Sequence, residues 1–86
     1  MRYRLSQHAR QELERRRISL TQLESVLNHP QQIVPVKKGR TVYQSQVDAV
    51  DGKMVLLRVI VVGNAGDVLV VTAYRTTRIS KYWRES

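Results

Sequence analysis

Apolar residues in the first part of the chain recur at the three- to four-residue spacing of a helix. Ser6 is a suitable N-cap for a helix that runs to about Arg16, because its hydroxyl can accept a hydrogen bond from the first helical turn. Ala9 and Leu13 form a narrow apolar stripe on that helix. The rest of its surface is polar, so we expect the helix to lie on the outside of the fold.

A second helix is predicted directly after the first, with a stronger apolar face. Residues 19–22 have the pattern of a capping box, with a hydroxyl at the N-cap and an amide three positions later. Pro30 ends the helix, because proline disfavours helical conformation in the residue before it. The apolar face consists of Leu20, Leu23, Val26 and Leu27.

After Pro30 the pattern changes to that of strands separated by turns. Pro35 indicates an edge strand, and Asp51-Gly52 is typical of a tight hairpin turn. The predicted strands span 33–37, 41–50, 54–62 and 68–76. The expected fold is a single α+β domain over residues 1–86. It has two N-terminal helices packed on a four-stranded antiparallel meander, followed by a basic C-terminal tail.

Turn positions predict the register of the sheet. A two-residue turn at 51–52 sets Ser45 opposite Arg58, and a second turn at Asn64-Ala65 sets Arg58 opposite Val71. The face expected to pack on the helices is then formed by Val34, Val36, Tyr43, Val47, Leu56, Ile60, Leu69 and Val71. The other face mixes polar and apolar side chains, namely Gln44, Gln46, Asp48, Val55, Leu57, Val59, Val70, Thr72 and Tyr74. Its apolar part needs a cover, for which we consider the chain's own tail through Ile79, Tyr82 and Trp83, a second copy, or a partner protein.

Positive charge is the dominant feature of the composition. Fifteen Lys and Arg face seven Asp and Glu, which gives a net charge of +8. Such an excess favours a nucleic-acid partner, and aromatic residues among the cations of the tail favour RNA, because rings stack on bases. The predicted nucleic-acid-binding residues are Arg75, Arg78, Lys81, Lys37, Lys38 and Arg40.

Other classes of protein are disfavoured by what the sequence lacks. There is no cysteine, and the apolar run from Met54 to Val62 is interrupted by Arg58 and too short to span a bilayer. No secretory pattern is visible at the start of the chain. The only histidines are His8 and His29, and acids are few, so neither a metal site nor a cofactor is expected. We expect a cytoplasmic protein without a membrane partner.

Two positions are candidates for chemistry. His8 shares one helix row with Glu12 and Arg16, and an imidazole there could act as an acid or base toward RNA, or be an ordinary exposed histidine. Arg58 interrupts an apolar strand. It is either buried and paired with a carboxylate such as Glu12 or Glu14, or it lies at the sheet surface and holds a phosphate.

Several segments resemble a small prokaryotic family that is known only as a domain of unknown function and is common in cyanobacteria. The resemblance covers nearly the whole chain. It is carried by residues 6–10, 12–13, 16–19, 23–27 and Pro30, and by 39–40, 52–53, 57–59 and 71–76.

The order of two helices, an antiparallel meander and a basic tail is also similar to RelE/ParE-like and BrnT-like toxins of toxin–antitoxin pairs. This resemblance implies a metal-independent endoribonuclease that acts on mRNA, usually at the ribosome. Its partner would be an antitoxin protein, or a second copy bound through the second sheet face. By that analogy the catalytic set is His8, Arg58, Tyr74 and Arg75. The alternative is a non-catalytic module that binds nucleic acid or protein, since fold alone does not establish function.

Overall fold

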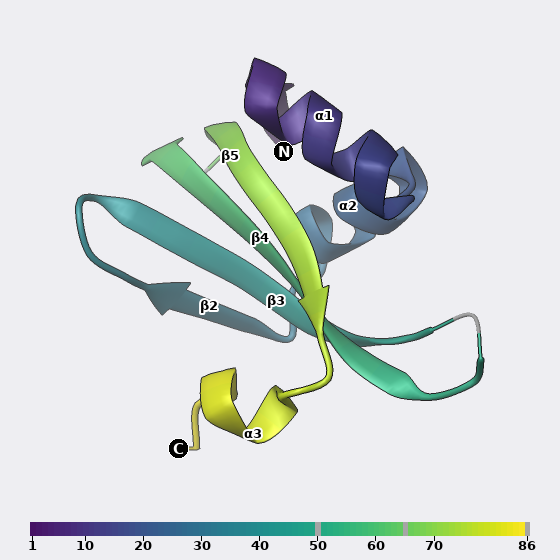
Figure 1. Ribbon diagram of the computed structural model, residues 1–86. Coiled ribbons are helices and arrows are strands. Elements are labelled where there is room, and N and C mark those ends of the chain that lie inside the picture. Colours follow the sequence, from purple (N-terminus) through teal and green to yellow (C-terminus); the bar gives the residue numbers. More distant parts are fainter. Residues whose placement is uncertain (50, 65, 86) are drawn as a thin grey trace.

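The computed structural model describes residues 1–49, 51–64 and 66–85. Within these residues the chain forms three helices and five strands, in the α+β class predicted from the sequence (Figure 1). In chain order the elements are β1 (Arg2–Leu5), α1 (Gln7–Arg16), α2 (Leu20–Asn28), β2 (Gln32–Pro35), β3 (Arg40–Asp48), β4 (Met54–Asn64), β5 (Asp67–Thr76) and α3 (Ile79–Tyr82).

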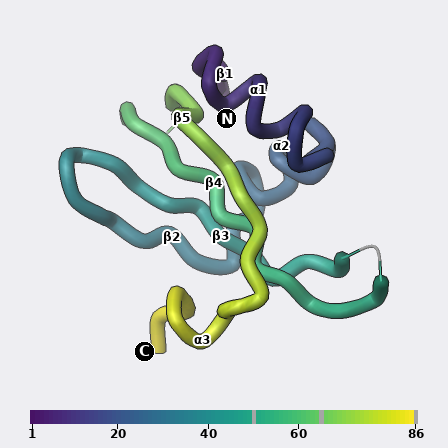
Figure 2. The backbone as a smooth tube through the Cα atoms, in the orientation of Figure 1, coloured from purple at the N-terminus to yellow at the C-terminus, as the bar shows by residue number. Residues whose placement is uncertain are grey.

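The strands make one sheet in the order β1-β5-β4-β3-β2. The neighbours from β2 to β5 are antiparallel, whereas β1 runs parallel to β5. The predicted four-stranded meander is therefore incomplete, because β1 adds a fifth strand that the sequence analysis missed. Figure 2 shows the first residues of the chain beside β5, which is formed by residues near the other end of the chain. The predicted edge position of Pro35 is confirmed, since β2 is the outer strand.

Both helix starts are as the sequence predicted. The Ser6 hydroxyl accepts a hydrogen bond from the backbone N–H of Ala9 at 2.9 Å, and the Ser19 hydroxyl accepts one from Gln22 at 3.1 Å. Each cap satisfies a backbone donor that has no partner inside the helix. The second helix ends at Asn28, shortly before Pro30.

The predicted register is wrong by one residue between β3 and β4. Ser45 faces Leu57, and Arg58 faces Gln44 on one side and Tyr74 on the other. The cause is the hairpin after β3, where Asp48 is paired with Met54 and a two-residue turn at 51–52 is too short to join them. A shift of one residue moves every side chain of a strand to the opposite face. Val50 and Ala65, which the predicted strand and turn included, lie outside the described residues.

The corrected register moves the side chains of β4 to the opposite face of the sheet, whereas Tyr43 and Val47 of β3 pack against the helix-side core as predicted. Leu57, Val59 and Val70 pack against α1 and α2, although they were predicted on the other face. Conversely, Val34, Ile60 and Val71 were predicted beneath the helices, but they form a smaller cluster with Val42 and Tyr74. The larger core consists of Ala9, Leu13, Ile18, Leu23, Val26, Leu27, Tyr43, Leu57, Val59, Val61, Val68, Val70 and Ala73.

The short helix α3 lies apart from α1 and α2 (Figure 1). It is held to the sheet by the amide of Gln44, which donates to the backbone carbonyl of Tyr82 at 3.1 Å. The tail therefore covers part of the second face, as one of the sequence alternatives proposed. In the described part of the chain, no helix has the length and apolar character needed to cross a membrane.

Candidate anion-binding site

Arg58 lies at the centre of a polar cluster on the second face of the sheet. Its side chain is placed by β4, and only 8% of the residue is exposed. Its Nε donates to Oε1 of Gln44 at 2.9 Å, and a terminal nitrogen donates to the Tyr74 hydroxyl at 2.7 Å. Cross-strand pairing explains the contacts, because Gln44 and Tyr74 are the register partners of Arg58 on the two neighbouring strands.

Two tyrosine rings complete the surroundings of this guanidinium. Its central carbon lies 4.2 Å from the ring centroid of Tyr82 and 5.8 Å from that of Tyr74. The rings meet edge to face, with centroids 6.4 Å apart. The face of an aromatic ring attracts a cation, so these contacts stabilise the position of the guanidinium but supply no negative charge.

Within residues 1–49, 51–64 and 66–85, no carboxylate pairs with the guanidinium of Arg58. Both hydrogen-bond acceptors are neutral, and the sequence prediction that Glu12 or Glu14 pairs with Arg58 is wrong. Glu12 instead bonds Arg15 and Arg16 on its own helix, and these are the ion pairs formed among the described residues. A largely buried charge usually has an ionic partner. An anionic ligand is the kind of group that would complete this site.

An open groove of about 470 Å³ runs along the sheet from this cluster. Arg58 and Tyr74 line one part of it. The apolar side chains of Val42 and Ile60, which are register partners on β3 and β4, also line it. The predicted cations of the β2–β3 connection also line the groove, namely Lys37, Lys38 and Arg40. All three are exposed, so the groove has a solvent-exposed positive rim beside the largely buried guanidinium of Arg58.

Tyr82 has a perturbed acidity in this cluster. A hydrogen bond with Tyr74 is the largest influence that lowers the pKa of the Tyr82 hydroxyl below its usual value. The ammonium of Lys81, 5.2 Å from the ring centroid, and the Arg58 guanidinium act in the same direction. Nearby cations favour the ionised form of a phenol. Tyr82 is therefore more easily deprotonated than an ordinary tyrosine.

The structure does not bring all of the predicted site residues together. Arg58 and Tyr74 meet, and Lys81 lies close by on α3. Arg78 is exposed immediately before α3. His8 is exposed on α1, and Arg75 donates to the backbone carbonyl of Arg16 at the end of the same helix. His8 and Arg75 thus belong to the helix-covered side of the sheet, away from the Arg58 cluster.

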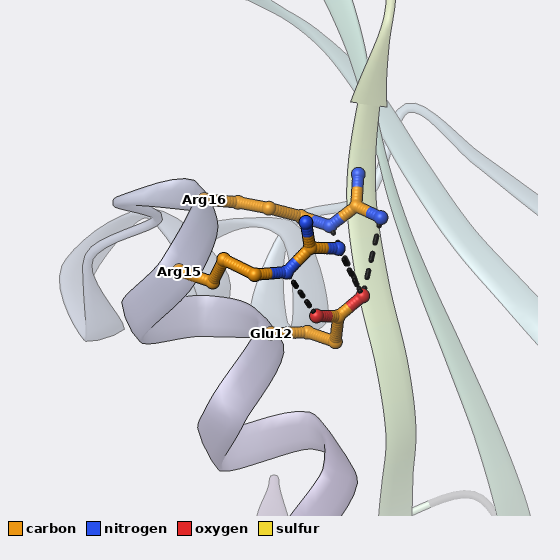
Figure 3. Close-up of polar contacts among 3 residues, drawn as sticks. All are labelled: Glu12, Arg15 and Arg16. Carbon is orange, nitrogen blue, oxygen red and sulfur yellow. Dashed lines mark hydrogen bonds and ion pairs between the residues drawn. The ribbon is translucent and has the colours of Figure 1, made fainter.

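The row that contains His8 is organised around an ion-pair cluster instead (Figure 3). Glu12 accepts hydrogen bonds from Arg15 Nε at 2.8 Å and from Arg16 at 3.1 Å. Arg15, and then Arg16, hold the pKa of the Glu12 carboxyl at about 2, below its usual range. A carboxyl with a depressed pKa is a source of acid sensitivity.

We expect Glu12→Gln to change the stability of the protein only above about pH 2. The ionised carboxylate stabilises the fold above the pKa of an unfolded glutamate, and this contribution is lost as the pH falls toward about 2. Urea unfolding of both proteins between pH 7 and pH 2 would measure it. The variant should be less stable at neutral pH, and the two curves should converge in acid. Glu14→Gln, on the exposed side of the same helix, is the control and should show a smaller difference. A constant difference at every pH would contradict the assignment.

Three residues of the cluster, Gln44, Gln32 and Tyr82, were not identified as site residues from the sequence. Gln44 was predicted on the face that mixes polar and apolar side chains, Gln32 was not considered, and Tyr82 was predicted only as part of the tail that covers this face. The available signal for Gln44 was weak, because it follows the apolar residues Val42 and Tyr43 but begins the polar run 44–46. Gln32 gave no such signal, because its role depends on contacts with the distant tail.

Comparison with known proteins assigns the chain a family without an activity. The model of a family described as a domain of unknown function (DUF4258) matches residues 5–75. No curated protein and no solved structure matches the chain. The matched range includes Arg58, Gln44 and Tyr74, and it ends before α3.

Proposed function

We propose that this chain, which belongs to the DUF4258 family of domains of unknown function, binds RNA through the groove beside Arg58. The observation that carries the proposal is the buried guanidinium of Arg58, whose hydrogen-bond partners are the neutral groups of Gln44 and Tyr74. A phosphate would supply the missing negative charge. Charge-assisted hydrogen bonds from arginine to phosphate are about twice as strong as neutral ones.

The shape and charge of the groove favour a polyanion over a single small anion. Arg58 on β4 is paired with Gln44 on β3. Arg40 lies four residues before Gln44 on the same strand. At about 3.3 Å per residue this separation is roughly 13 Å along the strand. Lys37 and Lys38 extend the positive rim. One phosphate cannot contact both ends, whereas a nucleic-acid backbone can.

Binding of a fluorescent single-stranded RNA, followed by polarisation as the salt concentration rises, tests the proposal. If about three phosphates are contacted, the logarithm of the association constant should fall with the logarithm of salt at a slope of about −2. Absence of binding at low salt would refute the proposal. Strong binding with an association constant that does not change with salt concentration would refute the electrostatic basis of the proposal.

Metal-independent endoribonuclease activity is a second candidate function. It is favoured by the lowered pKa of Tyr82, whose ring lies 4.2 Å from the Arg58 guanidinium carbon. In the proposed reaction, the Tyr82 phenolate takes the proton of a ribose 2′-hydroxyl, and the 2′ oxygen bonds to the adjacent phosphorus. The bond from phosphorus to the 5′ oxygen breaks, and that oxygen takes up a proton from water. The products are a 2′,3′-cyclic phosphate and a 5′-hydroxyl, and Arg58 stabilises the charge that develops on the phosphoryl oxygens.

This second candidate carries the remaining sequence predictions with it. The likeness to RelE/ParE-like and BrnT-like toxins, action at the ribosome, and an antitoxin partner or homodimer on the second sheet face all stay predictions. Tyr82 replaces His8 as the proposed base, because His8 lies on α1 rather than beside Arg58. Inducible expression followed by mapping of cellular RNA ends tests this candidate. Intact RNA with normal growth would leave RNA binding as the only proposed activity.

A further inference from the structure

We propose that Gln44 is the positioning residue of the Arg58 site. Its neutral amide orients the guanidinium, fastens the C-terminal turn over it, and leaves the positive charge available to a phosphate. This inference rests on the proposed RNA-binding function. Gln44 contributes through Arg58 and Tyr82, which are the groups placed to meet the ligand.

The geometry of Gln44 fixes which way its amide points. The residue is fully buried, and Oε1 accepts the hydrogen bond from Arg58 Nε at 2.9 Å. Nε2 therefore faces the opposite way and donates to Oε1 of Gln32 at 2.8 Å and to the carbonyl of Tyr82 at 3.1 Å. An amide offers one acceptor and one donor group, and both are used here. Neither a carboxylate nor a hydroxyl could make the same set of contacts.

Gln32 extends the same attachment by one more step along the tail. Its Oε1 accepts from the backbone N–H of Arg84 at 3.0 Å, and its Nε2 donates to the carbonyl of Arg84 at 2.7 Å. The two glutamines thus hold the tail by backbone atoms of Tyr82 and Arg84. The ring of Tyr82 remains free to lie over Arg58, at 4.2 Å from its centroid to the guanidinium carbon.

The choice of an amide rather than an acid also sets the charge of the site. A glutamate at position 44 would have the same size and would still accept from Arg58. It would, however, form an ion pair with the guanidinium and compete with a phosphate for it. It would also place a negative oxygen against the Tyr82 carbonyl, where Gln44 now donates. Gln44 accordingly holds the tail over Arg58 and leaves the positive charge of the guanidinium without an ion pair.

The test is Gln44→Glu, with Gln46→Glu as the matched control. Gln46 is partly exposed, two residues along the same strand, so its substitution adds the same charge to the same face. We expect Gln44→Glu to remain folded in urea titrations and to bind single-stranded RNA at least tenfold more weakly. The slope against salt should become shallower by about 0.7, as for the loss of one phosphate contact. The control should lose much less affinity.

A double variant and a tail readout separate the possible outcomes. Adding Arg58→Met to Gln44→Glu should cause little further loss, because both changes remove the same phosphate contact. Additive losses, or equal losses in the two glutamate variants, would overturn the inference while leaving RNA binding intact. If the unaltered protein binds no RNA, the proposed function fails and the charge role of Gln44 fails with it.

The attachment of the tail is judged separately from the fluorescence of Trp83, the chain's single tryptophan. Its fluorescence should shift to longer wavelength in Gln44→Glu, and an unchanged spectrum would refute that role.

Discussion

Replacing Arg58 with methionine is expected to weaken RNA binding by about 10- to 100-fold. A hydrogen bond from a charged group contributes about 1.5–3 kcal/mol, and each 1.4 kcal/mol corresponds to a factor of ten in affinity. Methionine keeps most of the volume in a nearly closed environment, where Arg58 is 8% exposed. Because Arg58 is not part of the larger core beneath α1 and α2, the fold should survive. Polarisation with labelled RNA would measure the affinity, and circular dichroism would verify the fold.

Arg10→Met is the matched control for this experiment. Arg10 is exposed on α1, so its loss lowers the net charge by the same amount without touching the groove. An effect of the same size in both variants would show that overall charge, rather than Arg58, determines binding. Arg58→Lys should fall between the two. It retains the charge, but a lysine ammonium lacks the planar fork that contacts Gln44 and Tyr74 together.

Tyr82→Phe is expected to reduce RNA cleavage by about 10²- to 10⁴-fold, the usual contribution of a positioned acid or base. The ring, and with it the contact to Arg58, is retained, and the tail is held by the backbone of residue 82 rather than by the hydroxyl. RNA affinity should therefore change little. Gel analysis of a labelled RNA in the presence of EDTA, together with polarisation, would measure both quantities.

Tyr3→Phe provides the control for loss of a tyrosine hydroxyl. The Tyr3 hydroxyl donates to Glu24 at 2.7 Å, a contact between β1 and α2 that does not involve the groove. This variant should cleave as fast as the unaltered protein. If Tyr82→Phe cleaves RNA as fast as the unaltered protein, Tyr82 is not the base. If purified protein leaves RNA intact, the nuclease candidate is rejected and the binding proposal stands on its own.

Local sequence signals predicted the elements but not their pairing. The caps at Ser6 and Ser19 depend on neighbouring residues, and they were located correctly. The register depends on one residue in a hairpin connection, and this error exchanged the faces of β4. The strand β1 was missed because its Arg-Tyr-Arg-Leu sequence is short and charged. It becomes a strand by pairing with β5, which no local pattern reveals.

The candidate site was only partly predictable for the same reason. Arg58 was recognised because a charge in an apolar strand is conspicuous, and Tyr74 was recognised from the tail composition. Their partners follow from register, so the error that set Arg58 opposite Ser45 also hid Gln44. The ion pair expected with Glu12 is not formed because Arg58 lies on the face of the sheet opposite α1, and Glu12 bonds Arg15 and Arg16 on its own helix. Contacts between Gln32 and the tail join segments that are 52 residues apart.

The parallel pairing of β1 with β5 has a consequence for how the chain folds. The side chain of Ser6, immediately after β1, donates to the carbonyl of Val71, 65 residues later. Closing a loop of that length costs entropy before the contact stabilises anything, and such topologies fold slowly. During synthesis β1 must also wait until β5 has left the ribosome. We therefore expect β2 to β5 to assemble first and β1 to join them late. The contacts of β1 should then have little effect on the folding rate and should mainly slow unfolding.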